Sequence, residues 1–464
     1  MTYRHHPITW ICALLLFPAL VEAADWPCWR GPNHDNVSTE TGWRTDWKAN
    51  PPSLLWKAAT GFGQACPVIA NGRVFVHGDD NAQAAHKAEY HQTLFALDAA
   101  TGKELWKDDT VVTSNNNQPI TYSPAVDGDR VYFYSSSATL KCLEAATGKP
   151  VWVKDLPQTL GTPRFVNYGY RCSPVVWQDR VIVTVRTPAP KGDPAPRTSN
   201  LTAFNKLTGE VLWTNSQPSV DLPYVKGSYG PWGANWHTPT PATIQGRAMV
   251  LFNTGASIVG VDMQDGKTLW EWKVPEDELL KESGVSAVSP VVTGDIVIFH
   301  YWSGHASGHT YALRVKPDFS VERLWKSDDL TGWKFVCTTA YKDAVFGFHQ
   351  PGVHAFGPLT CIDLATGKKK WSQDKVGSAL TIVDGYLLLW DGVRVRLAEA
   401  AGQGYRELGV TGDLPTTAAV LTPRENSVTR SSMIIPPILS NGRLYCRNIS
   451  GDLFCLDVRR EGSP

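Results

Sequence analysis

The 464-residue sequence predicts an all-β fold, an eight-bladed β-propeller made of four-stranded antiparallel blades. Two observations predict it. A pattern of β-rich runs, tight turns and a closing tryptophan recurs every several tens of residues, as is typical of propeller blades. An isolated outer-strand pattern near the N-terminus supplies the strand that the last repeat lacks, so the two ends together would close a ring.

The second repeat shows the pattern most clearly. It opens with Ser123-Pro124 and a β-rich run, and Asp127-Gly128-Asp129 separates this run from the next. A third run leads to Thr147-Gly148-Lys149, and the outer strand contains Trp152. Aspartate and glycine tolerate the positive φ of tight turns, and β-branched and aromatic residues suit half-buried strands. The tryptophan is large enough to fill the gap between neighbouring units.

The repeats divide the chain into eight blades. The blades end, in order, at Trp106, Trp152, Trp213, Trp270, Trp325, Trp371, Leu408 and Val458. Blade five lacks the glycine turn, and blade seven (381–408) lacks the tryptophan, so seven blades is the alternative if that segment is an insertion. Blade eight (437–458) has only three strands, and Leu54-Leu55-Trp56-Lys57 reads as its missing outer strand.

The rest of the chain flanks the propeller, which spans 54–458. Residues 1–23 have the short apolar stretch and the small residues of a cleaved signal peptide, with an uncleaved anchor as the alternative. Residues 24–53 contain four tryptophans and are predicted to pack on the ring as an arm, and 459–464 form a tail. The sequence therefore predicts an exported protein, periplasmic or at the cell surface, with no membrane span in its mature form.

Charge and cysteine content narrow the function classes. The 44 basic and 44 acidic residues cancel, which gives no basis for nucleic acid or an anionic membrane as the main partner. Export permits disulfides. Cys446 and Cys455 flank the expected turn Ser450-Gly451, and a two-residue loop there would place them opposite each other as a disulfide. The alternative is two free buried thiols.

The repeat, from its Ser-Pro opening to Thr-Gly-Lys and tryptophan, resembles that of the PQQ-like (pyrrolo-quinoline quinone) repeat propellers. This family includes quinoprotein alcohol dehydrogenases and the outer-membrane assembly factor BamB. The opening Trp26-Pro27-Cys28-Trp29-Arg30-Gly31-Pro32-Asn33 is similar to the start of many exported members. The resemblance covers residues 26–458 and implies the fold, whereas one fold hosts many functions.

The resemblance also allows a test for catalysis. Quinoprotein dehydrogenases hold the quinone with calcium over the channel, using acidic and amide ligands, a catalytic aspartate and often a disulfide between adjacent cysteines. This sequence has no adjacent cysteines, and no acidic residue enters the inner strands of blades one to six. No catalytic residue is carried over. We expect no cofactor, and PQQ with calcium is the alternative.

Long insertions identify the face expected to bind. They fall between the second and third strands of blades one, three, five and six, at 78–91, 187–200, 303–309 and 350–358. In a propeller these connections share one face, which we call the loop face, with the linkers between blades. Repeat proteins usually place binding on such a face.

Several polar residues, Tyr122 among them, should enter the channel mouth from the loop face. The candidate ligand-binding residues are Gln64, Arg171, Trp236, His237, Lys334 and Arg430. Basic groups beside aromatic rings favour an anion or carboxylate. The alternative is that these side chains cover the channel rim or pair with acids from the insertions.

Three histidines on neighbouring loops of this face, His305, His309 and His354, are weak candidates for a metal site, with ordinary solvated loops as the alternative. The sequence thus predicts a binding or scaffold module without catalysis, acting through its loop face on an envelope protein or a small anionic ligand. The alternatives are a quinone-dependent oxidoreductase and a BamB-like component of envelope protein assembly.

Overall fold

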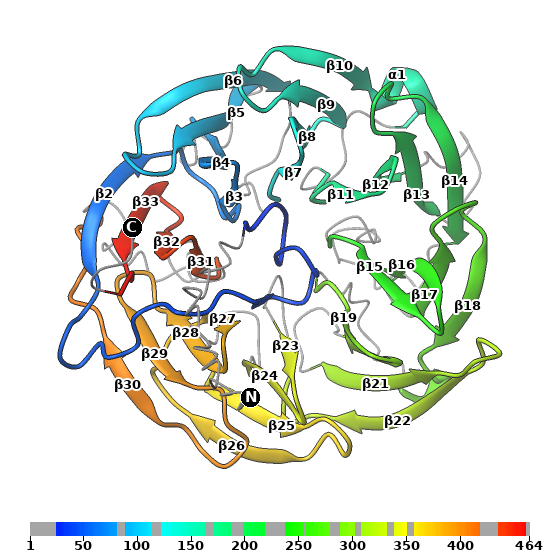
Figure 1. Ribbon diagram of the computed structural model, residues 1–464. Helices are drawn as coiled ribbons and strands as arrows, with labels where there is room; N and C mark the ends of the chain where they lie inside the picture. Colours follow the sequence, from blue (N-terminus) through cyan, green and yellow to red (C-terminus); the bar gives the residue numbers. More distant parts are fainter. Residues whose placement is uncertain are drawn as a thin grey trace, which may run out of the picture.

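The computed structural model describes residues 25–80, 89–113, 122–162, 170–186, 198–218, 237–254, 257–278, 288–301, 308–331, 338–349, 357–417 and 435–460. Eight antiparallel sheets stand around a central axis (Figure 1), so the eight-bladed prediction is confirmed and the seven-bladed alternative is wrong. In the described part of the chain, no helix is long and apolar enough to cross a membrane.

Each blade runs from an inner to an outer strand. Blade one contains β3 (Val68–Ala70), β4 (Arg73–Asp79), β5 (Glu89–Asp98) and β6 (Glu104–Thr113). Blade two contains β7 (Ala125–Asp127), β8 (Arg130–Tyr134), β9 (Thr139–Glu144) and β10 (Pro150–Asp155), followed by helix α1 (Leu156–Leu160). Blade three contains β11 (Val175–Trp177), β12 (Arg180–Arg186), β13 (Thr198–Asn205) and β14 (Val211–Pro218). Blade four contains β15 (Thr240–Ile244), β16 (Arg247–Asn253), β17 (Ser257–Asp262) and β18 (Thr268–Lys273), then the 3₁₀ turn η1 (Glu276–Glu278).

The second half of the ring repeats the arrangement. Blade five contains β19 (Val291–Thr293), β20 (Ile296–Tyr301), β21 (His309–Val315) and β22 (Val321–Ser327). Blade six contains β23 (Thr339–Tyr341), β24 (Ala344–Phe348), β25 (Leu359–Asp363) and β26 (Lys369–Gln373). Blade seven contains β27 (Ala379–Val383), β28 (Tyr386–Trp390), β29 (Val395–Glu399) and β30 (Glu407–Val410), joined on the inside by β1 (Val37–Ser38). Blade eight contains β31 (Ile438–Ser440), β32 (Arg443–Arg447) and β33 (Asp452–Asp457), completed by β2 (Ser53–Ala59).

The N-terminal strand closes the ring as predicted. Strand β2 pairs antiparallel with β33, and Trp56 lies opposite Cys455. Closure gives the last blade its fourth strand from the other end of the chain. It removes the open edge that a three-stranded blade eight would present.

The repeated glycine and tryptophan meet between blades. The tryptophan of one outer strand packs on the glycine of the next blade's outer turn, where an added Cβ would lie 2.6–2.9 Å from the ring. The pairs are Trp56 with Gly102, Trp106 with Gly148, Trp152 with Gly209, Trp213 with Gly266 and Trp325 with Gly367. The indole N–H then donates to a carbonyl of the same turn, as Trp106 Nε1 does to Ala145 O at 3.1 Å. Each tryptophan therefore locks two neighbouring blades together.

Blade four shows what happens without the glycine. Blade five has Phe319, at φ +61°, where the outer turns of blades one to four and of blade six have glycine. Trp270 of blade four instead turns onto its own sheet, where a Cβ on Gly260 would lie 2.3 Å from its ring. Its indole N–H meets the Met249 sulfur at 3.3 Å. The different orientation of Trp270 in blade four therefore goes together with the missing glycine in the outer turn of blade five.

We expect Gly148→Ala to destabilise the protein far more than Gly128→Ala. Both glycines have positive φ, +74° and +58°, but only Gly148 faces a ring, with Trp106 2.6 Å from the added Cβ, while nothing lies within 4 Å at Gly128. The strain of positive φ costs about 1 kcal/mol at either site, and the clash adds about 1–3 kcal/mol at Gly148. Urea unfolding of the two variants measures the difference, and equal losses would contradict the interlocking role.

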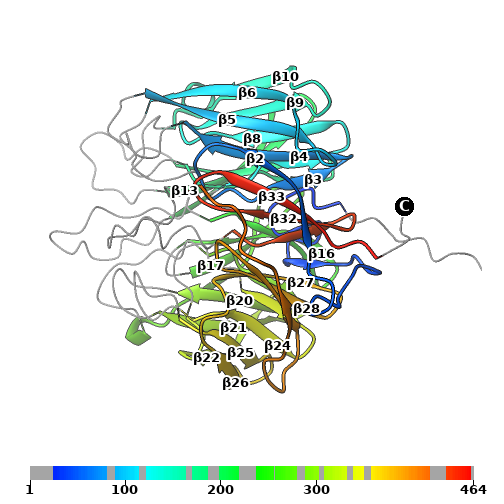
Figure 2. The ribbon, with the colours of Figure 1, turned by 90° about the vertical axis from the view of Figure 1, so that its left-hand side faces the viewer.

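The N-terminal arm crosses the channel on the face opposite the loop face (Figures 1 and 2). Trp26 exchanges backbone hydrogen bonds with Ile69 of blade one, and Val126 N of blade two donates to Pro27 O. Strand β1 pairs parallel with β27 of blade seven, and the Glu40 carboxylate accepts from the backbone N–H groups of Asn441 and Gly442 in blade eight. The arm therefore ties together blades seven, eight, one and two, which are neighbours in the closed ring.

A buried arginine holds the junction between blades eight and one. Arg447 has no exposed surface and lies at the end of β32. Its guanidinium donates to the carbonyls of Gly61, Gly63 and Ala65 at 2.9–3.0 Å, and its Nε donates to Thr60 Oγ1 at 3.0 Å. Those acceptors belong to the segment between β2 and β3, so Arg447 fixes the crossing from the closing strand into blade one. Burial lowers the pKa of Arg447 to about 10.

Of the two alternatives for Cys446 and Cys455, the structure has the pair of free buried thiols and not the disulfide. The hairpin loop is longer than two residues, since Asn448 N donates to Asp452 O around it. The register therefore puts Cys446 opposite Phe454 and Cys455 opposite Tyr445. A shift of one residue sends the two thiols to opposite faces of the sheet, Cys446 toward the blade seven side and Cys455 toward blade one.

Candidate functional site

A polar network lies at the loop-face end of blades one and two. The Gln92 side chain is its centre: Oε1 accepts from Tyr122 Oη at 3.0 Å and from Ser136 N at 3.1 Å. Gln92 Nε2 donates to Ser136 Oγ at 2.7 Å and to Tyr90 Oη at 3.3 Å. Gln92, Tyr122 and Ser136 are buried and Tyr90 is half-buried, so the network reaches toward solvent through Tyr90.

Arg171 from blade three lies next to this network. The residue before it, Tyr170, donates its backbone N–H to Ser136 O at 3.2 Å. Arg171 is 6 % exposed, and its charge opposes the burial that raises the pKa of Tyr90 and Tyr122. The structure thus brings together Arg171 and Tyr122, both of which the sequence placed at the channel mouth.

His77 lies behind the same network. Its ring is 5.1 Å from that of Tyr122 and stands perpendicular to Phe133 at 4.3 Å. Burial, followed by the charge of Arg447, lowers the pKa of His77 well below its usual value. His77 is therefore a neutral core group and contributes no charge to the mouth.

The other candidate ligand-binding residues divide into two groups. Gln64 is buried at 4 % exposure. His237 accepts a hydrogen bond at Nε2 from Asn253 N at 3.1 Å, packs on Phe252, and has its pKa lowered to about 3 by burial. It adds an acceptor to blade four and no positive charge. Trp236, Lys334 and Arg430 lie outside the described residues.

The histidines proposed as metal ligands are only partly described. His309 pairs through Nδ1 with Asp328 Oδ1 at 2.5 Å. His305 and His354 lie outside the described residues. Across the twelve described ranges, no three His, Cys, Asp or Glu side chains gather as metal ligands.

The opposite end of the channel is filled by the arm. Arg30 is 3 % exposed and donates from its two terminal nitrogens to Pro290 O at 3.0 Å and Thr338 O at 2.6 Å, at the entries to blades five and six. His300 bonds Thr310 Oγ1 and Thr338 Oγ1, both at 2.7 Å. Burial, aided by Arg30, lowers the pKa of His300 to about 4. The sequence showed the arm's tryptophans but gave no sign that its arginine enters the channel.

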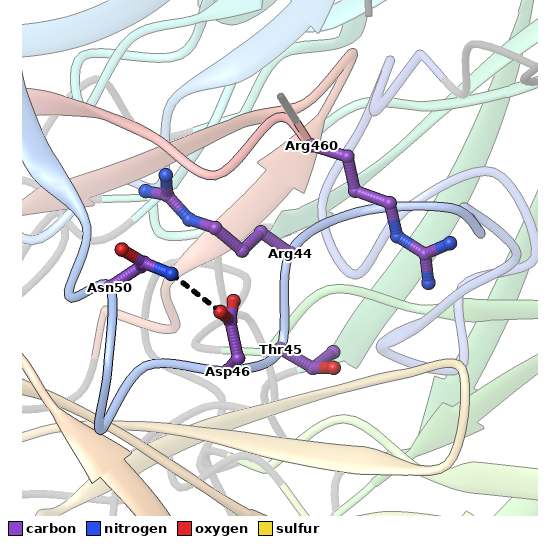
Figure 3. Close-up of a pocket in the computed structure, with 5 residues that line it drawn as sticks. All are labelled: Arg44, Thr45, Asp46, Asn50 and Arg460. Atoms are coloured by element: carbon purple, nitrogen blue, oxygen red, sulfur yellow. Dashed lines mark hydrogen bonds between the residues drawn. The ribbon is translucent and has the colours of Figure 1, made fainter. Parts of the chain in front are cut away.

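A hollow of about 350 Å³ lies beside the arm, lined by Arg44, Thr45, Asp46, Asn50 and Arg460 (Figure 3). Asn50 Nδ2 donates to Asp46 Oδ2 at 2.7 Å, and Arg44 donates to Asp457 O at 2.9 Å. Figure 3 shows the two guanidinium groups pointing in opposite directions. They do not converge on one position, so the hollow lacks the fork that an anion would need.

The outer rim carries the most distinctive surface. In the described chain, nine large aliphatic side chains are exposed by 39 to 61 %, and all belong to blades eight, one, two and three. They are Leu54, Leu55, Leu105, Val111, Val151, Val153, Leu207, Val211 and Leu212. We call this set the aliphatic rim. It follows β2, β6, β10 and β14 around one half of the ring (Figure 1). An exposed apolar surface confined to one side is typical of a protein-binding site.

Sequence reasoning missed the aliphatic rim for a physical reason. A leucine or valine precedes the tryptophan in blades one to three, but Leu269 and Leu324 stand in the same place in blades four and five. Those two are partly buried against neighbouring core residues. The sequence pattern is the same, and only packing separates exposed from covered positions.

Comparisons with known proteins agree with this architecture. A family model described as outer membrane protein assembly factor BamB matches residues 90–332, more than half of the chain. The BamB of Moranella endobia (strain PCIT) is 27 % identical over 277 residues, and the match covers 56 % of each chain, so this chain matches little more than half the length of that relative.

Solved structures show the same fold. BamB from Moraxella catarrhalis aligns with a TM-score of 0.54 at 15 % identity, covering 88 % of this chain and 99 % of that one. The quinohaemoprotein alcohol dehydrogenase of Comamonas testosteroni aligns with a TM-score of 0.64 at 14 % identity, covering 95 % of this chain and 81 % of that one. At these identities the likeness is one of fold. Together with the family match and the eight blades of repeated strands, it shows that the chain belongs to the PQQ-repeat propeller family described as outer membrane protein assembly factor BamB.

Proposed function

We propose that this chain is a non-catalytic binding scaffold of the cell envelope, exported after removal of residues 1–23, that takes part in outer-membrane protein assembly. The observation that carries the proposal is the aliphatic rim on blades eight, one, two and three. Membership of the family named for an assembly factor supports the same direction.

The rim suits a protein partner for two reasons. Protein interfaces of ordinary size bury roughly 800 Å² on each side, which needs a surface extending over several blades. The tryptophan locks and the arm hold those blades in fixed relative positions, so little conformational entropy is lost on binding. The insertions of the loop face fall largely outside the described residues, so the proposal concerns the outer rim.

We expect the triple variant Leu105→Glu, Val153→Glu, Leu212→Glu to lose association with the outer-membrane protein assembly machinery of the source cells. Three carboxylates in the interface would have to be desolvated without partners. The measurement is co-purification of that machinery with affinity-tagged protein after mild crosslinking, with the wild type beside the variant.

The matched control is Lys273→Glu with Lys368→Glu, exposed positions on blades four and six. It also adds negative charge to the rim but on the other half of the ring. Retained association in the control and loss in the triple variant supports the proposal. Equal association of wild type and triple variant, or no association of the wild type with the machinery, overturns it.

A further inference from the structure

The outer strand of blade one is an open edge. Strand β6 pairs with β5 alone and is the last strand of its sheet. The direction in which the backbone groups of β6 point can be derived from the hydrogen bonds of β5, the strand that β6 pairs with. His91 O accepts from Asp80 N on the β4 side, while Asp98 N donates to Lys103 O on the β6 side. In β5, the backbone N–H and C=O groups of odd-numbered residues therefore point toward β4, and those of even-numbered residues point toward β6.

The same alternation applies to β6. Its register pairs Trp106 with Ala96, Asp108 with Leu94 and Thr110 with Gln92. These even residues hydrogen-bond to β5, so the backbone N–H and C=O groups of Lys107, Asp109 and Val111 point outward. The register shifts by one residue at Leu105, which lies in a β-bulge outside this alternation. Val111, one of these three, belongs to the aliphatic rim.

In the part of the chain that the structure describes, the edge of β6 lacks the protection that the other outer strands have. It is ten residues long, against six for β18, seven for β22, five for β26 and four for β30. β10 starts at Pro150 and runs into α1, and β14 ends at Pro218. On β2, Lys57 donates to Pro415 O at 2.8 Å. Shortness, proline and covering segments are the usual means of preventing an edge from pairing with another chain.

The edge is also held in place from its other face. Trp106 packs on Gly148 of blade two. The Asp108 carboxylate pairs with Lys141 of the same blade at 2.7 Å, and both side chains are at most 15 % exposed. A strand so fixed would lose little entropy when another strand pairs with it.

We propose that β6 accepts an extended segment of another polypeptide as a fifth strand of blade one. The proposal deepens the scaffold function, on which it rests, by naming the kind of segment that binds. The outward row is Lys107, Asp109 and Val111, with Asp109 Oδ1 held by Thr93 Oγ1 at 2.6 Å. Cross-strand pairing therefore selects a strand with an acid opposite Lys107, a base opposite Asp109 and an apolar residue opposite Val111.

The test uses a fluorescent peptide of about nine alternating β-branched and polar residues, long enough to span the outward row, with glutamate and lysine placed to meet Lys107 and Asp109. Binding is followed by anisotropy to the full-length mature protein. We expect Lys107→Pro, which removes an outward N–H without touching the β5 ladder, to weaken binding about 10-fold or more. Lys107→Ala, which keeps the N–H, should weaken it about threefold or less.

Two further arms keep the outcome decisive. A peptide methylated at its pairing backbone nitrogens, and a peptide with glutamate and lysine exchanged, should each bind at least about 10-fold more weakly. Val111→Pro beside Val111→Ala repeats the backbone test if Lys107→Pro does not fold. Equal binding of the proline and alanine variants, or of the methylated and plain peptides, overturns strand addition. If the peptide fails while the assembly machinery still binds through the rim, the strand site is wrong and the scaffold function stands.

Discussion

Replacing Arg447 with methionine should destabilise the protein by about 3–5 kcal/mol, because several buried acceptors lose their donor at once. The substitution keeps much of the side-chain volume but removes every donor that reaches the Thr60–Ala65 carbonyls. Those acceptors are buried and each would lose about 1 kcal/mol or more of hydrogen bonding. Arg447→Lys should fall between, since one ammonium cannot reach acceptors spread along a planar fork.

Urea unfolding followed by tryptophan fluorescence measures this prediction. The control is Arg406→Met, which removes an exposed ion pair with Glu399 and should cost less than about 1 kcal/mol. Similar decreases in the free energy of unfolding of the two variants would show that Arg447 does not stabilise the junction between blades eight and one.

Acid should unfold this protein steeply between pH 6.5 and about 4. His34, His237 and His300 are buried, and burial lowers their pKa values to about 4, 3 and 4. In the unfolded chain they take up protons near pH 6.5, whereas in the folded state they stay neutral. The unfolded state therefore binds more protons as the pH falls, and the stability present above pH 6.5 is lost, by about 3 kcal/mol per histidine at pH 4.

The measurement is the free energy of unfolding in urea at pH values from 7 to 4. Its slope near pH 5 should correspond to an uptake of about four protons, three from these histidines and one from the buried His77, in addition to that of the carboxylates. His237→Gln keeps an acceptor for Asn253 N but cannot titrate, so its slope should be lower by about one proton. A wild-type free energy that stays flat from pH 6.5 to 5 would contradict the buried neutral state of these rings.

The blades could be predicted from sequence because each repeat carries its own turns. Asp127-Gly128-Asp129 and Thr147-Gly148-Lys149 fix both ends of blade two by local backbone preference, and the structure places turns at both. The closing strand was also predictable, since Leu54-Leu55-Trp56 had no partner elsewhere in the pattern. Even the odd case of blade five was visible as a missing glycine, although its effect on Trp270 was not.

The candidate site was less accessible to the sequence. Arg171 and Tyr122 were placed at the mouth because position in the repeat gives the end of a strand. Tyr90 and Gln92 lie in the first half of β5, which begins before the part of the strand that the repeat pattern predicts. Their place in the network therefore depends on how far β5 extends, which the pattern does not give. The register expected for the hairpin of Cys446 and Cys455 differs from the observed one by one residue, and such a shift moves every side chain to the opposite face of the sheet. The sequence indicated His237 as a basic group of the channel mouth, but burial lowers its pKa and keeps the ring neutral, which only the structure shows.

The closure of blade eight bears on how the chain reaches its native state. Strand β2 finds its partner β33 only when almost the whole chain is available, since Ala59 pairs with Asp452. As the chain is synthesised, β2 emerges early and its Leu54, Leu55 and Trp56 stay unpaired, while the blades between can form from local contacts. Pairings so distant in sequence form late and leave apolar edges open to aggregation. We therefore expect the pairing of β2 with β33 to be the last step of folding, and the step at which a chaperone would be most useful.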